Sequence, residues 1–434
     1  MARCFLSCLG TSPYEECIYV APDGRESPPV RYVQEATVGF FCRDWTAEDR
    51  LLIFTTPDAY QKNWRDNGHQ DGQPGLERRL KGLGLAPQIR RVEVPEGKTI
   101  REIWQIFQIL YEHLRAEDRV VCDITHGFRS LPMLVLAVLG YARTLKKVVP
   151  EGIYYGALEA LGTPAEIKRM PVKDRRVPLF DLTAFAVLLD WTTAVDRFLA
   201  AGDASQAREL AEKEVKPLLK KSQGRDQAAK AIKTIADHLQ GLTRALSTCR
   251  GPELARKFTG LKAALGDCPR KDLIEPFAPL LQLLEERLQE YQEKFRHPFL
   301  MAARWCAEHN LLQQGFTILQ EGLISYVLEI ELGVLPENLK DKDLRDLVPQ
   351  SARIYTLSLD REQWLEPARS HPEKIEKLLR FWKENTKLRE IFDTLSQHRN
   401  DLNHAGFLKD YRSSEKFSHK LRELLTEVEL HLKP

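Results

Sequence analysis

The sequence predicts two domains of different class, an α/β domain over residues 1–183 and an all-α region over residues 184–434. In the first part, short apolar runs alternate with segments whose apolar residues recur at helical spacing. This alternation favours a doubly wound parallel sheet. After Thr183 the strand-like runs cease and long helical patterns replace them. A chain of 434 residues is also long for one domain, which supports the division.

The strands of the first part are expected where apolar runs end at Gly, Thr, Ser or Pro. Residues 17–21 and 30–33 are expected to pair as a hairpin around a polar stretch that contains Gly and Pro. Residues 100–114 are expected to be helical, because Ile103, Ile106 and Leu110 form one apolar stripe. The expected strands are 4–9, 17–21, 30–33, 50–54, 89–94, 120–124 and 152–158, and the expected helices are 35–43, 100–114 and 131–146.

The second part is expected to be a helix bundle. Its helices are predicted over 184–200, 205–220, 226–248, 273–293, 301–332 and 374–398. Loops are expected at 250–253, 266–270 and 335–360.

Composition restricts the class of protein. The formal net charge of +2 is far from that of a protein that coats nucleic acid, so any RNA contact should be local. The eight cysteines form no CxxC pair and several lie in apolar runs, which favours reduced core thiols and predicts no metal site. The N-terminus shows no signal-peptide pattern and the longest apolar run is too short to cross a bilayer. We therefore expect a soluble cytoplasmic protein without membrane contact.

A polar loop follows the apolar run at 120–124 and reads Thr125-His126-Gly127-Phe128-Arg129-Ser130. Gly127 permits an unusual backbone conformation, Thr125 and His126 offer hydrogen bonds, and Arg129 is a planar cation suited to phosphate. A second strand-end turn, Gly10-Thr11-Ser12, could present backbone N–H groups to the same ligand. The alternative is a capped turn between strand and helix in which Arg129 pairs with Asp123. The residues alone leave both interpretations open.

A second motif, Arg399-Asn400-Asp401-Leu402-Asn403-His404, stands in a helical region near the C-terminus. RNA cleavage without a metal uses the neighbouring 2′-OH as nucleophile. It also needs a group that moves protons, which His404 can supply, and a cation for the phosphate, which Arg399 can supply. Asn400 could orient His404 or hold a phosphate oxygen. The alternative is that these are ordinary exposed helix residues, because an Arg and a His at this spacing often recur by chance.

The chain resembles the CARF–HEPN ribonucleases, ancillary effectors of type III CRISPR defence. Four stretches carry the likeness and extend over nearly the whole chain. They are Leu9-Gly10-Thr11-Ser12-Pro13, the segment from Asp123 to Pro132, the junction Phe180-Asp181-Leu182-Thr183 that leads to Asp190-Trp191, and Arg399-Asn400 with His404-Ala405-Gly406.

The resemblance implies an α/β Rossmann-like CARF sensor over 1–183, followed by a helical linker and an all-α HEPN ribonuclease domain over 184–434. It implies a homodimer, or a higher homo-oligomer, that binds cyclic oligoadenylate across its axis, with cyclic tetra-adenylate favoured. Single-stranded RNA is then cut at a site that two Arg-x4-His motifs form together, without metal or cofactor. By motif position, the activator would contact Gly10, Thr11, Ser12, Thr125, His126, Gly127 and Arg129, and the nuclease site would contain Arg399, Asn400 and His404.

Two other hypotheses remain from the sequence. One is a regulator without catalytic activity that senses a nucleotide and binds a protein or DNA through its helices. The other is a ring nuclease that degrades cyclic oligoadenylate in the α/β half and uses the helices to dimerise.

Overall fold

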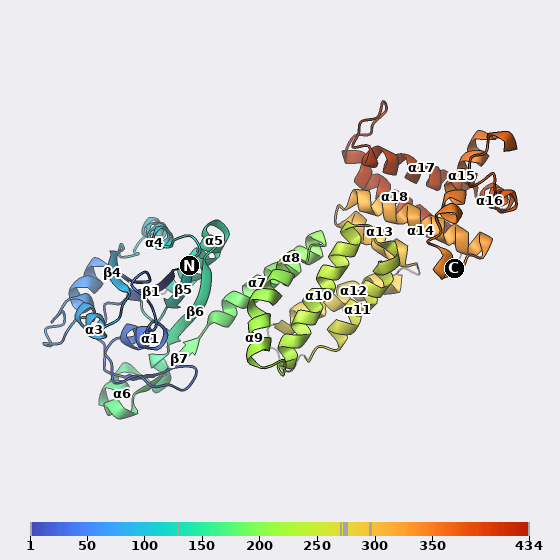
Figure 1. Ribbon diagram of the computed structural model, residues 1–434. Coiled ribbons are helices and arrows are strands. Elements are labelled where there is room, and N and C mark those ends of the chain that lie inside the picture. Colours follow the sequence, from blue (N-terminus) through green and yellow to red (C-terminus); the bar gives the residue numbers. More distant parts are fainter. Residues whose placement is uncertain (1, 128–129, 270, 272–276, 295–296, 433–434) are drawn as a thin grey trace. The chain divides into compact units, whose positions relative to one another are not determined.

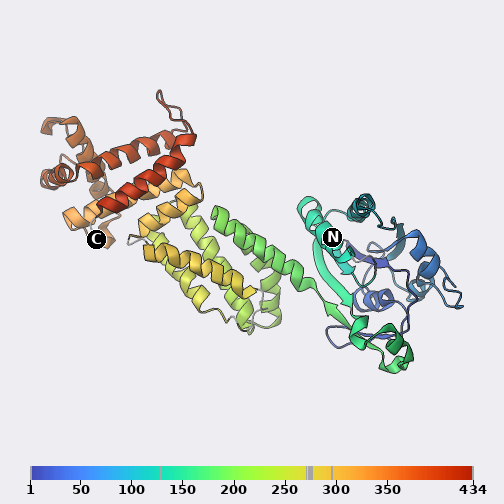
Figure 2. The same cartoon turned by 180° about the vertical axis from the view of Figure 1, so that it is seen from behind.

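The computed structural model describes residues 2–127, 130–269, 271, 277–294 and 297–432. The chain divides into two compact units, Met1–Leu189 and Asp190–Pro434. Figures 1 and 2 show strands and helices in the first unit and helices in the second. The predicted boundary after residue 183 falls at the start of α7 (Thr183–Ala201), which continues past the division between the units.

The first unit is built on a seven-stranded sheet of order β2-β7-β6-β5-β1-β3-β4. Its central pairs are parallel, while β6 and β7 run antiparallel, so the sheet is mixed rather than purely parallel as predicted. The strands are β1 (Arg3–Leu9), β2 (Ile18–Val20), β3 (Arg50–Thr55), β4 (Gln88–Glu93), β5 (Arg119–Asp123), β6 (Val149–Gly156) and β7 (Arg176–Asp181).

The predicted hairpin of 17–21 with 30–33 is confirmed only in part. Cys17 and Val30 form an isolated antiparallel bridge, as do Val20 and Glu26, but no continuous ladder follows: β2 pairs in parallel with β7, and Val33 begins a helix. The stretch Ser27-Pro28-Pro29 lacks two consecutive backbone donors, so it cannot continue a ladder. Strand β7 was not predicted, and it is the partner that β2 uses instead.

Helices cover both faces of the sheet, as a doubly wound fold requires. Side chains alternate along β3: Leu52 packs with the core that contains α4 and α5, whereas Leu51 and Ile53 pack with the core that contains α1 and α3. The helices are α1 (Val33–Phe41), α2 (Pro57–Ala59), α3 (Leu76–Gly82), α4 (Ile100–His113), α5 (Leu131–Lys146) and α6 (Pro164–Arg169), with a π turn η1 (Tyr60–Trp64) and 3-10 turns η2 (Leu158–Leu161) and η3 (Val172–Asp174).

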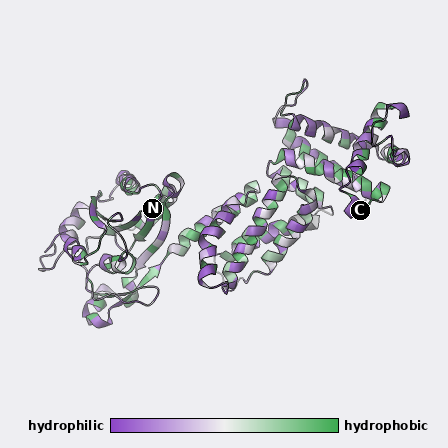
Figure 3. Ribbon diagram, in the orientation of Figure 1, coloured by the Kyte–Doolittle hydropathy of each residue, from purple (hydrophilic) through white to green (hydrophobic). Residues whose placement is uncertain are grey.

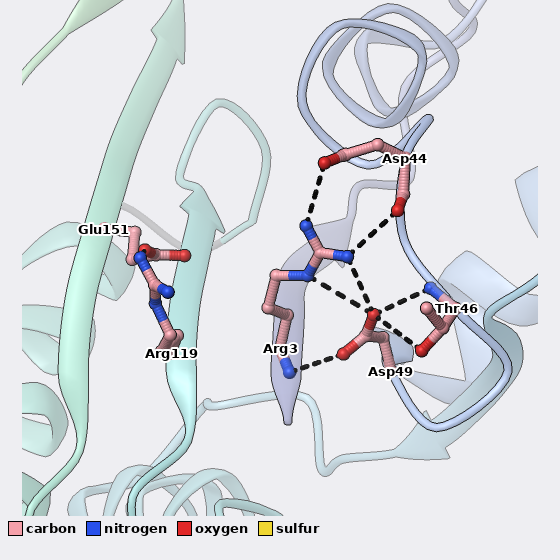
Figure 4. Close-up of polar contacts among 6 residues, drawn as sticks. All are labelled: Arg3, Asp44, Thr46, Asp49, Arg119 and Glu151. Carbon is pink, nitrogen blue, oxygen red and sulfur yellow. Dashed lines mark hydrogen bonds and ion pairs between the residues drawn. The ribbon is translucent and has the colours of Figure 1, made fainter. Parts of the chain in front are cut away.

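A buried carboxylate ties β1 to the turn before β3 (Figure 4). Asp49 accepts hydrogen bonds from the backbone N–H of Arg3 at 2.7 Å and from that of Thr46 at 2.8 Å. The guanidinium of Arg3 also pairs with Asp49, at 3.2 Å, and with the exposed Asp44, at 3.1 Å. Burial raises the pKa of Asp49, but the hydrogen bonds from Thr46 and Arg3 outweigh it and hold this pKa below 3.8.

The second unit is helical throughout its described elements, and its helices are amphipathic (Figure 3). On α10, for example, Ile235, Leu239 and Leu242 are buried. The helices are α8 (Ser205–Leu210), α9 (Lys216–Lys221), α10 (Gln227–Ser247), α11 (Gly251–Gly266), α12 (Ala278–Lys294), α13 (Pro298–Glu308), α14 (Leu312–Leu332), α15 (Lys342–Leu357), α16 (Pro372–Glu384), α17 (Thr386–Asn403) and α18 (Glu415–His431), with short turns η4 (Ala211–Val215), η7 (Pro336–Asn338) and η8 (Arg361–Gln363).

Several predicted helix boundaries need correction. The predicted helix 301–332 is two helices, α13 and α14, and 374–398 is divided between α16 and α17. The predicted loop 335–360 is wrong, because most of it forms α15, a helix capped by the side chain of Asp341, which accepts from the N–H of Leu344 at 3.0 Å. Pro349 lies inside α15. An internal proline disfavours a helix, so the sequence pattern predicts a loop here. Residues 273–276 of the predicted helix 273–293 lie outside the described residues.

Of the eight cysteines, all except Cys249 are buried, in agreement with the prediction of core thiols. Within the described parts of the chain, no helix combines the length and apolar character needed to span a bilayer.

We predict that Asp49→Ala destabilises the first unit by ~2–3 kcal/mol, because the substitution leaves the buried donors of Arg3 and Thr46 without an acceptor. Amide hydrogen exchange in β1 and β3 is the local measurement, and exchange there should accelerate. The matched control is Asp44→Ala, which removes the exposed partner of the same arginine and should change exchange little. Equal effects of the two substitutions would contradict the role given to Asp49.

Candidate functional site

The loops that follow β1 and β5 meet at one edge of the sheet. β1 has β3 on one side and β5 on the other, so the chain changes direction between β1 and β5, where doubly wound folds bind ligands. The two loops touch: a side chain at Gly10 would bring a Cβ within 2.5 Å of the Tyr14 hydroxyl and 3.6 Å of the Cβ of His126. The structure therefore brings two of the predicted activator segments together.

The hydroxyl of Thr125 is used inside the fold. It donates to the buried carboxylate of Asp123 at 2.6 Å and accepts from the backbone N–H of Gly156 at 2.8 Å. Asp123 also accepts from the Ser7 hydroxyl at 2.9 Å, and Gln34 donates to the same hydroxyl oxygen at 3.0 Å. Burial raises the pKa of Asp123, and the hydrogen bonds from Thr125 and Ser7 oppose that rise. Thr125 thus shapes the loop through contacts within the protein.

His126 and Tyr14 form a half-buried pair beside this turn. Their rings lie 4.4 Å apart between centroids. Burial lowers the pKa of His126 to about 4, so its imidazole is neutral near pH 7. His126 Nε2 has no hydrogen-bond partner among the residues that the structure describes, whereas the Tyr14 hydroxyl lies against the backbone of Gly10. A buried polar atom without a partner is costly, and a ligand can remove that cost.

A pocket of about 380 Å³ lies across the ends of β1 and β3 and extends to the segment after β4. Gly10, Thr11 and Gly127 line it. Gly127 has φ +133°, and a Cβ there would lie 2.6 Å from Leu131 Cδ2, so the position favours glycine. The remaining lining residues are Cys8, Leu9, Phe54, Thr56, Asp58, Val94, Glu96 and Lys98.

Ser12 and Arg129 complete the predicted activator set. Ser12 is exposed, and its backbone carbonyl accepts a hydrogen bond from the Asn63 amide at 2.9 Å. The same amide nitrogen donates to the carbonyl of Gly10, also at 2.9 Å. Asn63 therefore holds the turn after β1, and the sequence analysis missed it because no motif marks this residue. Arg129 lies outside the described residues, so its proposed pairing with Asp123 is not described either.

The second predicted site lies at the end of α17. The guanidinium of Arg399 reaches α14, where Nη1 lies 3.2 Å from Glu321 Oε1 and 3.4 Å from Gln320 Oε1. The other carboxylate oxygen of Glu321 accepts from Arg345 at 2.7 Å. Gln320 is buried, and its amide donates to Ser396 on α17 at 2.8 Å. Arg399 is therefore held by two neighbouring residues that the sequence analysis did not select.

Asn400 and His404 are exposed, and His404 is the C-terminal cap of α17. The carbonyl of His404 accepts from the backbone N–H of Phe407 at 2.9 Å. Between these residues, the buried Asp401 accepts from the backbone N–H of Arg412 at 2.9 Å and so fixes the loop that follows the helix. In the described contacts, Arg399 is paired with Glu321, and no hydrogen bond joins its side chain to that of His404.

No group of three or more His, Cys, Asp and Glu side chains in the described ranges has the arrangement to hold a metal ion.

We predict that the His126 ring does not titrate between pH 5 and 8. Because its pKa is lower in the folded chain than in the unfolded chain, protonation of the ring favours unfolding. The contribution of His126 to the free energy of unfolding is therefore fully present above pH 6.5 and is lost as the pH falls from 6.5 to about 4. NMR of ring-labelled histidine measures the titration directly, with His126→Gln to assign the signal. A midpoint near 6.5 for that signal would contradict the buried, neutral state.

This chain is similar to a curated protein, the CRISPR-associated protein MJ1674 of Methanocaldococcus jannaschii. The two are 26% identical over 267 residues, which are 60% of this chain. The matched stretch spans 36% of the length of that protein, so the two chains share only a part. No protein-family model matches the chain. The similarity is distant, and it connects this chain with a CRISPR-associated protein.

Proposed function

We propose that the protein is a metal-independent endoribonuclease of type III CRISPR antiviral defence, activated by a cyclic oligoadenylate, with the tetra-adenylate favoured. Its substrate is single-stranded RNA, cleaved at a site that two copies of the chain form together. The observation that carries the proposal is the end of α17, where Arg399 is held by Glu321 while Asn400 and His404 remain exposed. The similarity to a CRISPR-associated protein supports the biological setting.

The proposed reaction is an internal transfer. The 2′-OH of the RNA attacks the adjacent phosphorus, the P–O5′ bond breaks, and a 2′,3′-cyclic phosphate and a 5′-OH result. His404 moves the proton, and Arg399 stabilises the charge that grows on the phosphate oxygens. Asn400, on the same exposed helix end, orients the histidine or holds a phosphate oxygen.

A homodimer would complete the proposed nuclease site. Within one chain, the Arg399 side chain is paired with Glu321 and the His404 side chain lies at the exposed helix end. A second copy that places its own helix end opposite would bring its own Arg399 and His404 to the same site. The same two-fold axis suits a cyclic oligoadenylate, since a ring with two-fold symmetry can use each strand-end loop twice.

The proposed activator site uses the pocket at the ends of β1 and β3. Gly10, Thr11 and Gly127 line this pocket and allow backbone to approach phosphates. His126 stands beside Gly127 without lining the pocket, and its unpartnered Nε2 suits a neutral polar atom of adenine. The activator must bind the active arrangement of the nuclease more tightly than the inactive one, because a ligand shifts only an equilibrium whose states it binds unequally.

One assay tests the proposal against its rivals. The full chain is incubated with labelled RNA and with cyclic oligoadenylates of several sizes, in EDTA. Loss of RNA that requires the activator supports the proposal. Loss of the activator alone selects a ring nuclease, and loss of neither selects a regulator without catalytic activity.

We predict that His404→Ala lowers activated RNA cleavage by about 10²-fold or more, because the reaction loses its proton-transfer group. Binding of the activator should be unchanged. The matched control is His419→Ala, which removes another exposed histidine, on α18, and should leave cleavage near the wild-type rate. Undiminished cleavage in His404→Ala would refute the assigned site.

We predict that Arg129→Ala weakens activator binding by about 10-fold, the effect of losing a charge-assisted hydrogen bond to phosphate. Calorimetry with cyclic tetra-adenylate measures the affinity. Arg101→Ala, which removes an exposed arginine at the start of α4, is the matched control. An unchanged affinity in Arg129→Ala would count against the assignment of this loop.

A further inference from the structure

A pocket of about 380 Å³ lies between α14 and α15, next to Arg399. Arg399 itself is one of its lining residues, so the pocket is continuous with the proposed nuclease site. Four cationic side chains line it, Lys340, Lys342, Arg345 and Arg399, against two carboxylates, Glu321 and Asp346. This local excess of positive charge contrasts with a chain whose net charge is only +2.

Two of these cations are fixed by the protein. Arg345 donates to Ser325 at 2.9 Å, to the carbonyl of Leu339 at 3.0 Å and to the carboxylate of Glu321 at 2.7 Å. Arg399 pairs with the other oxygen of Glu321 at 3.2 Å. The carboxylate of Glu321 thus pairs with both guanidiniums and fixes their positions in the wall of the pocket.

Lys340 and Lys342 are different. Both are exposed, and within the described part of the chain neither has a carboxylate at ion-pair distance. Asp341, which stands between them, is already used as the cap of α15, where its side chain accepts from the N–H of Leu344 at 3.0 Å. The two ammonium groups are therefore available to a ligand at the rim of a pocket that already contains Arg399.

We propose that this pocket binds the RNA backbone, with Lys340 and Lys342 contacting phosphates that neighbour the one held by Arg399. The inference rests on the proposed ribonuclease function and names the surface that positions its substrate. Flexible ammonium groups bind phosphates as point charges and do not read sequence, so this surface would bind single-stranded RNA irrespective of its bases. Attraction from a local cationic surface also fits a protein that is not basic overall.

The test uses the full chain with His404→Ala, so that RNA is bound without being cut, in the presence of cyclic tetra-adenylate. Binding of a labelled single-stranded RNA is measured by fluorescence anisotropy at several salt concentrations. The double variant Lys340→Ala/Lys342→Ala should bind about 10-fold more weakly, and the slope of log affinity against log salt should fall by about 1.4, since each phosphate contact on a single strand contributes about 0.7.

The matched control is Lys377→Ala/Lys383→Ala, which removes two exposed lysines from α16 and changes the net charge equally. It should bind RNA like the parent. Lys340→Arg/Lys342→Arg keeps the charge and should restore the affinity, which excludes a folding defect as the cause. In the catalytically competent chain, Lys340→Ala/Lys342→Ala should raise KM about 10-fold and leave kcat within about two-fold, as expected for contacts equally strong in the ground and transition states.

Two results overturn the proposal but leave the proposed ribonuclease function in place. One is an unchanged affinity and salt slope in Lys340→Ala/Lys342→Ala, while the wild-type chain still cuts RNA; RNA then does not bind at this pocket. The other is an equal loss in the α16 control, which would mean that net charge alone attracts RNA. If the wild-type chain neither binds nor cuts RNA, the proposed function and this inference both fall.

Discussion

The buried carboxylate of Asp123 links two central strands of the α/β unit near their carboxyl ends. It accepts from Ser7 on β1 and from both the N–H and the hydroxyl of Thr125, so β1 and the turn after β5 are held in one network. The turn after β5 can then leave the sheet with His126 packed against Tyr14, and Gly127 can face the pocket. Removing this carboxylate would release the turn after β5 and loosen β1, because Thr125 in that turn and Ser7 in that strand both donate to it.

Each candidate site in the chain is organised by a carboxylate that does no chemistry in the proposed reaction. Asp123 shapes the turn after β5, Glu321 bridges Arg345 and Arg399, and Asp401 anchors the loop after α17 through Arg412. Carboxylates suit this task because one side chain can accept several hydrogen bonds from different elements. Converging donors reduce the cost of burying such a group, although on Asp123 burial still outweighs them and its pKa stays raised.

The sequence predicts the α/β class, the helical second half and the central strands, because these features are local and periodic. It does not predict which strands pair at the edge of the sheet. β2 pairs with β7, which lies far along the chain, and no local sequence pattern indicates that pairing. The sequence does not predict α15, because Pro349 stands inside it and an internal proline disfavours a helix. The helix forms because burial of Leu347 and Val348 outweighs that local penalty. Motif spacing selects Arg399 and His404, but Glu321 and Asn63 come from distant elements and become evident only when the chain is folded.

The π turn η1 supports the loop that follows β1. A π turn accommodates one residue more than an α turn, and here it presents Asn63 to the carbonyls of Gly10 and Ser12. Deleting a single residue between Tyr60 and Trp64 would convert the wide turn to an ordinary one and rotate the amide away from both carbonyls. The length of this short segment, together with the asparagine at position 63, therefore sets the shape of the loop after β1. Homologues that keep an asparagine here but lose one residue should have a differently shaped loop.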